Sequence, residues 1–292
     1  MPEVKLTEEY GFCFGVRRAL EIALTNLEQG ISFDSLGPII HNEYVVGELR
    51  RKGVEVVDSI EQSKKSHVLV RTHGVPPEIY ERAKEFGKTI IDCTCPFVAK
   101  AQWWAKKFYE EGYVVLVIGT KDHPEVIGIV GQTEGKALVV SSQKELDVSL
   151  IRNKRVGVVA QTTSRLDMVE DIMGLLVKEA NEVRFANTRC NTTQRRQDEV
   201  EELSREVEVM VIVGGKNSSN TRRLYEIASR NCKRAYLIEF PNELMEEWFY
   251  NVSTVGVSAG ASTPPEIVEE VYKKINILLK GGTYGERKVD EG

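Results

Sequence analysis

The chain has 292 residues, of which 41% are hydrophobic and 28% are charged, and its formal net charge is −5. These values are typical of a globular protein, and the negative charge gives no general support for nucleic-acid binding. No apolar run approaches the roughly 18 residues that span a bilayer, and the first residues lack a signal-peptide pattern. We therefore expect a cytoplasmic protein that binds neither nucleic acid nor a membrane.

Strands and helices alternate along the whole chain. The first third predicts a strand over 2–8, helices over 16–30, 43–52 and 78–86, and strands that end near 40, 70 and 92. The second third predicts helices over 97–111, from 124 and over 165–179, with strands over 113–118, 137–140 and 155–159. The last third predicts helices over 192–206, 219–230 and 264–279, with strands over 208–213, 234–238 and 253–258. This alternation is typical of parallel sheets.

Two pairs of strands indicate an internal repeat. Residues 115–121 are similar to 211–216, and residues 156–160 are similar to 255–259. A repeat at a nearly fixed period determines the architecture. We predict three similar α/β modules, over residues 1–95, 96–189 and 190–281, followed by a flexible Gly-rich and charged tail over 282–292.

Polar residues recur at fixed distances from three of the five cysteines. Twenty-eight residues after each of them the chain has His41, His123 and Ser218. A third polar position follows in each module, at His73, Thr162 and Ser262. Each module thus offers one cysteine, which is Cys13, Cys95 or Cys190, and two polar groups.

Cys95 has the most informative local sequence. It follows a β-branched run and precedes Pro96, and proline is favoured at the first position of a helix. The sequence therefore predicts Cys95 in the turn between a strand and a helix. In open α/β sheets, this is the edge at which ligands bind.

The cysteine count favours metal binding over disulfides. Five cysteines are an odd number, and a chain of this length needs no disulfide framework. Three converging thiolates suit an iron–sulfur cluster better than a structural zinc site, which four ligands normally close. One iron would then lack a protein ligand and be open to substrate. We assign the remaining two, Cys93 and Cys232, to the ordinary class of buried apolar thiols.

The segment 216–222 is rich in hydroxyl, amide and cationic side chains at the predicted start of a helix. Ser and Asn are ordinary helix N-caps, but four such residues after two glycines are more typical of an anion cradle. Glu125, two residues after His123, either complements a helix dipole or transfers protons. Thr162 either passes a proton or caps a turn. His67 precedes a strand and is expected to be a surface or capping residue.

Together these motifs resemble the 4-hydroxy-3-methylbut-2-enyl diphosphate reductases, over residues 3–279. The resemblance rests on the sequences at 11–16 (GFCFGV), 41–42 (HN), 72–75 (THGV), 94–96 (TCP), 123–126 (HPEV), 161–163 (QTT), 216–220 (KNSSN) and 259–262 (AGAS). Two positions depart from the family pattern, in which Ala usually replaces Cys93 and His often replaces Gln102. Neither is among the family's assigned site residues.

The resemblance implies a cloverleaf of three α/β modules around a central cavity that holds one [4Fe-4S] cluster. Cys13, Cys95 and Cys190 would ligate three irons, and the apical iron would take the substrate's hydroxyl oxygen. Glu125 would deliver protons, and Thr162 would connect it to the hydroxyl group. The residues that would hold the diphosphate are His41, His73, His123, Ser218, Ser219, Asn220 and Ser262.

The implied reaction is a reductive dehydroxylation that yields isopentenyl and dimethylallyl diphosphate, the last step of the methylerythritol phosphate pathway. Such an oxidoreductase needs an electron donor, such as ferredoxin or flavodoxin. Two alternatives are a non-redox iron–sulfur dehydratase and a cluster-based sensor or carrier that binds phosphate esters without turnover. The anion cradle argues against a simple electron carrier, and consumption of electrons separates reductase from dehydratase.

Overall fold

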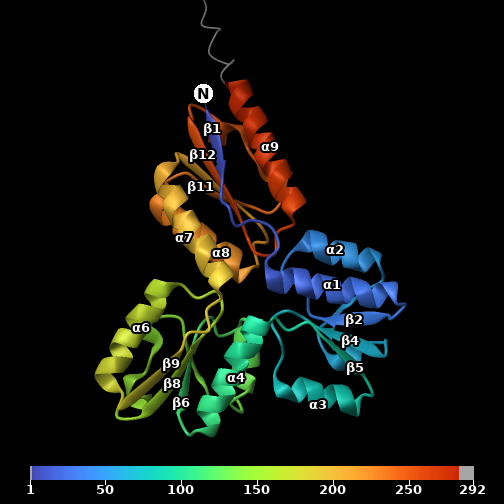
Figure 1. Cartoon of the computed structure of the whole chain (residues 1–292), viewed down its shortest axis with the longest axis vertical. Coiled ribbons are helices and arrows are strands. Elements are labelled where there is room, and N and C mark those ends of the chain that lie inside the picture. Colours follow the sequence, from blue (N-terminus) through green and yellow to red (C-terminus); the bar gives the residue numbers. More distant parts are fainter. Residues whose placement is uncertain (1, 283–292) are drawn as a thin grey trace, which may run out of the picture. The chain divides into compact units, whose positions relative to one another are not determined.

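The computed structural model describes residues 2–282 and confirms the predicted fold class (Figure 1). In this part of the chain, twelve strands form three four-stranded sheets in which every pairing is parallel. The sheet orders are β1-β12-β10-β11, β3-β2-β4-β5 and β7-β6-β8-β9. The strands are β1 (Glu3–Leu6), β2 (Phe33–Leu36), β3 (Val56–Val57), β4 (His67–Val70), β5 (Thr89–Asp92), β6 (Val114–Ile118), β7 (Leu138–Val140), β8 (Arg155–Ala160), β9 (Glu182–Ala186), β10 (Val209–Val213), β11 (Ala235–Ile238) and β12 (Thr254–Ala259).

The helices begin and end within a few residues of the predicted positions. They are α1 (Phe14–Glu28), α2 (Glu43–Arg51), α3 (Pro77–Glu85), α4 (Pro96–Glu110), α5 (Pro124–Gly131), α6 (Leu166–Glu179), α7 (Asn191–Glu206), α8 (Ser219–Asn231) and α9 (Pro265–Gly282). Proline occupies the start of α3, α4 and α5, where its missing N–H has no intrahelical partner to lose. The predicted flexible tail lies, except for residue 282, outside the described residues.

The described chain divides into two compact units. Unit 1 contains residues 2–13, 41–45 and 191–282, and unit 2 contains residues 14–40 and 46–190. In unit 1, α9 covers one face of the sheet, and α7 and α8 cover the other (Figure 1). The central strand β10 is buried along its whole length, as expected of a parallel strand between two helical layers.

Unit 2 contains the other two sheets. α3 packs on the β3-β2-β4-β5 sheet through an apolar cluster that includes Val68, Val70 and Ala83. The β7-β6-β8-β9 sheet has α6 on one face and α4 with α5 on the other. Each sheet is thus covered by amphipathic helices, and the loops at the carboxyl ends of its strands are left to carry polar side chains.

The first strand of the chain completes the last sheet. β1 pairs with β12, with Leu6 opposite Val257, so that residues 3–6 belong to the sheet formed by residues 209–259. The sequence placed this strand in the range of module 1. The other two sheets use consecutive segments, β2 to β5 and β6 to β9. The module boundaries after residues 95 and 189 remain our proposal.

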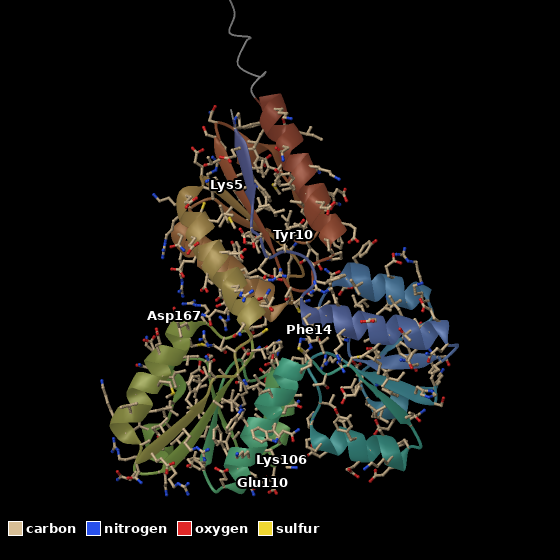
Figure 2. The ribbon with its side chains drawn as sticks, viewed as in Figure 1. Lys5, Tyr10, Phe14, Lys106, Glu110 and Asp167 are labelled. Atoms are coloured by element: carbon tan, nitrogen blue, oxygen red, sulfur yellow. The ribbon has the colours of Figure 1, made fainter. Side chains whose placement is uncertain are left out.

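Charged side chains occupy the outer faces of the layers. On α4, the Lys106 Nζ lies 3.8 Å from a Glu110 carboxylate oxygen, and both side chains are more than half exposed (Figure 2). Lys5 on β1 pairs similarly with Glu206 at 3.2 Å. Such exposed pairs contribute little to stability. Among the helices within residues 2–282, none is both long enough and apolar enough to cross a membrane.

Candidate active site

The three cysteines singled out in the sequence occupy equivalent places in the three sheets. Each follows an edge strand, and each donates its backbone N–H to a carbonyl in the loop after the neighbouring strand. These bonds run from Cys13 to Ala261 (3.0 Å), from Cys95 to Thr72 (2.9 Å) and from Cys190 to Thr162 (2.9 Å). All three cysteines are partly exposed, and none of the five cysteines, which all lie in the described chain, forms a disulfide.

The same bonds place each cysteine beside one of the third polar positions. Ala261 and Thr72 precede Ser262 and His73, and Thr162 is such a position itself. The sequence repeat had grouped Cys13 with the polar groups of module 1. In the structure, its loop adjoins Ser262 instead, because β1 joins β12.

Cys95 is the N-cap residue of α4, between β5 and Pro96, as predicted. Gly15, in the first turn of α1, lies against it: a Cβ atom at residue 15 would be 2.6 Å from the Cys95 Sγ. Cys93 and Cys232 are buried and donate their thiols to backbone carbonyls. Burial raises the pKa of the Cys93 thiol to about 12, so that Cys93 is poorly suited to be a thiolate ligand.

A buried carboxyl group lies beside the Cys190 loop. Glu125 is 1% exposed, and its two oxygens accept hydrogen bonds from the Thr162 N–H (2.6 Å) and hydroxyl (2.8 Å). Burial raises the pKa of Glu125 to about 7, against the opposing effect of the two bonds from Thr162. The carbonyl of Thr162 accepts the N–H of Cys190. A single threonine therefore joins a carboxyl group that titrates near neutrality to a cysteine loop.

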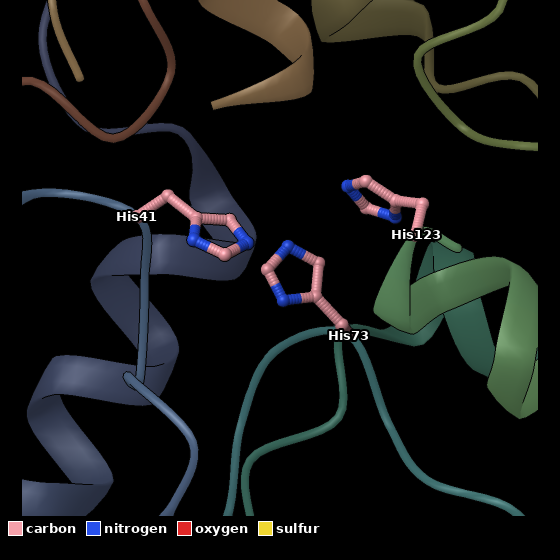
Figure 3. Close-up of side chains that lie close together, drawn as sticks. All are labelled: His41, His73 and His123. Carbon is pink, nitrogen blue, oxygen red and sulfur yellow. The ribbon is translucent and has the colours of Figure 1, made fainter. Parts of the chain in front are cut away.

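Two histidines of unit 2 face each other near this carboxyl group. The rings of His73 and His123 have centroids 5.2 Å apart and meet edge to face (Figure 3). His123 is the N-cap of α5, and its Nδ1 accepts the N–H of Glu125 at 3.2 Å. This bond requires a lone pair on Nδ1, so in the neutral ring Nε2 carries the proton.

Unit 1 carries the predicted anion cradle at the start of α8. Ser218 caps this helix by accepting the Thr221 N–H at 3.3 Å. The side chains of Ser218, Ser219, Asn220 and Ser262 are all less than one-tenth exposed. Within the described chain, neither polar atom of the Asn220 amide has a hydrogen-bond partner. A buried amide without a partner is costly, and a bound anion or its water would satisfy it.

His41 contributes its backbone to the same part of unit 1. A Cβ atom at Gly215 would be 2.3 Å from the His41 carbonyl oxygen, so only glycine permits this approach. The Ser262 hydroxyl lies 3.5 Å from the same carbonyl. The turn that carries His41 is thus held beside the loop that leads to Ser218.

The candidate residues therefore form two groups. Unit 1 brings together the loops of Cys13, His41, Ser218, Ser219, Asn220 and Ser262. Unit 2 brings together those of His73, Cys95, His123, Glu125, Thr162 and Cys190. His67 begins β4 next to the hydroxyl of Ser66 and belongs to neither group, as expected.

Three residues near these groups were not predicted from the sequence. Arg196 on α7 is 1% exposed and donates to two carbonyls near Cys13, and Thr188 bonds to β8 near Cys190. Gln102 on α4 packs against two glycines: a Cβ atom at Gly74 or at Gly128 would lie 2.6 or 2.7 Å from its amide nitrogen. Helix periodicity assigns polar residues such as Arg196 to the solvent, and no sequence pattern signalled the contacts of these three residues.

Comparison with known proteins extends over almost the whole chain. Residues 4–276 match the family model described as LytB protein. The chain is 42% identical to the 4-hydroxy-3-methylbut-2-enyl diphosphate reductase of Nitratiruptor sp., over 94% of this chain and 98% of that protein. It is also 42% identical to the Aquifex aeolicus protein of the same name, over 96% and 98% of the two chains.

Two solved structures are similar to this fold. One is described as (E)-4-hydroxy-3-methyl-but-2-enyl diphosphate reductase, the terminal enzyme of the non-mevalonate pathway. It has a TM-score of 0.69 and 41% identity, over 95% of this chain and 100% of that one. The other is the E-1-hydroxy-2-methyl-but-2-enyl-4-diphosphate reductase from Plasmodium falciparum, with a TM-score of 0.85 and 27% identity, over 94% of this chain and 87% of that one.

Proposed function

Because the chain belongs to the LytB family of 4-hydroxy-3-methylbut-2-enyl diphosphate reductases, we propose that it converts this diphosphate to isopentenyl and dimethylallyl diphosphate. The chain is an oxidoreductase of the non-mevalonate pathway. In the reaction, the C–O bond of the hydroxyl group breaks and the oxygen leaves as water. Two electrons and two protons are consumed: one proton completes the water, and the other adds to either end of the allylic fragment.

The chain's thiols suit the cluster that the reaction requires. Cys13, Cys95 and Cys190 are partly exposed and end equivalent edge strands, whereas the buried Cys93 thiol, with a pKa of about 12, does not suit a ligand. A donor set of three thiolates fits a [4Fe-4S] cluster. The cluster would supply the electrons, which come from a donor such as ferredoxin or flavodoxin, and an iron without a protein ligand.

Glu125 and Thr162 supply the protons in this proposal. At neutral pH a carboxyl group with a pKa of about 7 is present partly as the acid. Its protonated oxygen donates to the Thr162 hydroxyl, which passes its own proton to the substrate's leaving hydroxyl group. Thr162 bonds to the two Glu125 oxygens through its backbone N–H, at 2.6 Å, and through its hydroxyl, at 2.8 Å, and these bonds keep the two side chains within reach of each other for this relay.

The polar groups of the cradle bind the diphosphate. Ser218, Ser219, Asn220 and Ser262 provide neutral donors, and the buried amide of Asn220 gains the partner it lacks in the described chain. His41, His73 and His123 add N–H donors and, when protonated, positive charge. These donors would orient the anion without a nucleotide-type glycine loop.

The observation that carries the proposal is the bonding of Thr162, which joins the Glu125 carboxyl group to the Cys190 loop. A protein that only binds phosphate esters, or only stores electrons, has no use for a buried acid that titrates near neutrality beside a metal ligand. The arrangement favours chemistry in which electrons and protons arrive at one place.

The test is an anaerobic assay of the purified chain. Iron and acid-labile sulfide are quantified, and the hydroxylated diphosphate is added with a reduced viologen dye. We expect about four irons per chain, dye oxidation and both five-carbon diphosphate products. A cluster with loss of water from the substrate, but with neither dye oxidation nor the two reduced products, would establish the dehydratase. Binding without turnover would establish the sensor. Absence of iron after reconstitution would contradict the three-cysteine ligand set.

A further inference from the structure

The three cysteine loops occupy equivalent positions, but three different kinds of hydrogen bond hold them against the neighbouring strand. In each sheet, the cysteine N–H bonds to the loop after the neighbouring strand. A second pair of residues precedes each of these bonds. It consists of the residue two positions before the cysteine and the residue two positions before the one whose carbonyl accepts the cysteine N–H. The three pairs are Cys93 with Val70, Thr188 with Ala160, and Gly11 with Ala259.

In unit 2, both pairs are bonded directly. The Cys93 N–H donates to the Val70 carbonyl at 2.9 Å, which continues the β4–β5 pairing to Cys95. In the other sheet, the Thr188 hydroxyl accepts the Ala160 N–H at 2.9 Å and donates to the Ala160 carbonyl at 2.5 Å. Neither Cys95 nor Cys190 therefore needs a distant side chain to fix its approach.

In unit 1 the corresponding pair is Gly11 and Ala259, and both residues offer a backbone carbonyl, which can only accept a hydrogen bond. The β1–β12 ladder ends at Thr7, and residues 8–12 leave the sheet before the chain returns at Cys13. Gly11 adopts a φ of +75°, and its carbonyl is bonded to the same guanidinium as that of Ala259. Arg196 Nη2 donates to Gly11 at 2.8 Å, and Nη1 donates to Ala259 at 2.9 Å.

We propose that Arg196 is the positioning residue for Cys13 and replaces the direct bond that fixes Cys95 and Cys190. The planar guanidinium has two parallel donors, which match two carbonyls that cannot bond to each other. Arg196 is 1% exposed, so without it both carbonyls would lose their donor in a place that water reaches poorly. The inference rests on the proposed function only in treating Cys13 as a metal ligand.

The test is amide hydrogen exchange in the purified full chain, measured with and without its metal centre. Arg196→Met keeps an unbranched chain as far as the position of Nε and removes both donors. We expect exchange in residues 8–13 to accelerate about tenfold or more, whereas segments 93–95 and 188–190 change less than about twofold. Unchanged exchange at 8–13, or equal acceleration in all three segments, would overturn the proposal.

Three further variants sharpen the result. Arg205→Met removes a charge from the exposed part of the same helix, where Arg205 pairs with Glu201, and should change none of the three segments. Thr188→Val should accelerate exchange at 188–190 but not at 8–13. Arg196→Lys keeps the positive charge but not the two parallel donors of the guanidinium, so its exchange rate at 8–13 should lie between those of wild type and Arg196→Met. If Arg196→Met does not fold, the Lys and Val variants still decide the outcome.

In the metal-loaded protein, Arg196→Met should lose iron to a chelator faster than wild type, with Arg196→Lys intermediate. Iron loss at the wild-type rate, together with faster exchange at 8–13, would show that the loop is fastened by Arg196 but that Cys13 does not hold the metal. That outcome would contradict the ligand assignment and leave the reductase assay to decide the function.

Discussion

The two groups of candidate residues differ in how their buried polar atoms are satisfied. In unit 2, both oxygens of Glu125 are bonded to Thr162, so the acid is complete without a ligand. In unit 1, the buried amide of Asn220 has no partner within the described chain. A satisfied pair is preorganised for proton transfer, whereas an unsatisfied amide is suited to a ligand that arrives from solution. We therefore expect Glu125 to determine turnover and Asn220 to determine affinity.

The largest expected effect is that of Glu125→Gln. The amide keeps the shape of the carboxyl group but cannot deliver a proton, so turnover should fall by about 10²–10⁴-fold with little change in KM. The measurement is steady-state oxidation of the reduced dye at saturating substrate. Glu134→Gln, at an exposed residue bonded to Tyr109 and Lys136, is the control and should leave turnover unchanged. Normal turnover in Glu125→Gln would remove this residue from the mechanism.

A second substitution tests the cysteine loop of unit 2. In Gly15→Ala the new Cβ would be 2.6 Å from the Cys95 Sγ, so the sulfur must move. We expect the purified variant to retain less than about half of the wild-type iron, because overpacking displaces the ligand. Gly174→Ala on α6 is the control, since its new Cβ meets no atom of residues 2–282 within 4 Å. Full iron content in both variants would show that Cys95 is free to shift or is not a ligand.

Asn220→Ala tests the cradle of unit 1. Loss of a hydrogen bond to a charged group should raise KM by about 10- to 100-fold, with kcat nearly unchanged. The free protein should not be destabilised, because the substitution removes buried polar atoms that have no partner in the described part of the chain. Steady-state kinetics measures KM and kcat, titration calorimetry with inorganic pyrophosphate measures the corresponding loss of affinity, and thermal melts measure the stability. A fall in kcat at constant KM would place Asn220 with the chemistry instead.

Ser218→Ala should have the smallest of the expected effects and, unlike Asn220→Ala, should lower the stability of the free protein. Ser218 caps α8 through the Thr221 N–H, and loss of such a cap costs about 1 kcal/mol. Chemical denaturation measures this difference. Equal stability of the Ser218→Ala and wild-type proteins would mean that the hydroxyl is committed to the ligand rather than to the helix.

The sequence predicted those helices and strands whose formation depends on residues close together in the chain. The valine-rich strands and their turns placed nearly every element, and Pro96 located Cys95 at the start of a helix. The pairing of β1 with β12 was not predicted, because a strand's partner more than 240 residues away leaves no local signal. β9 was also missed as a strand, since its burial is only partial and its residues alternate weakly.

The site residues came from motifs rather than from patterns of burial. The motifs quoted from the sequence include Glu125 and Thr162, which the structure brings into hydrogen-bonding contact, and the relatives confirm the family. Arg196 was not predicted from the sequence, because α7 is polar almost throughout and the neighbouring Arg195 is exposed. Only the three-dimensional path of residues 8–12 creates the two carbonyls that a buried guanidinium must satisfy.

The most direct test of this account is the pH dependence of kcat/KM for the free enzyme. Burial raises the pKa of Glu125 to about 7, and the protonated form is the one that donates. The rate should therefore be level at acid pH and fall about tenfold per pH unit above about pH 7, and this fall should be absent from the residual activity of Glu125→Gln. A wild-type profile that stays level from about pH 6 to 9, or the same decline in the Gln variant, would contradict the assignment of Glu125 as the proton donor.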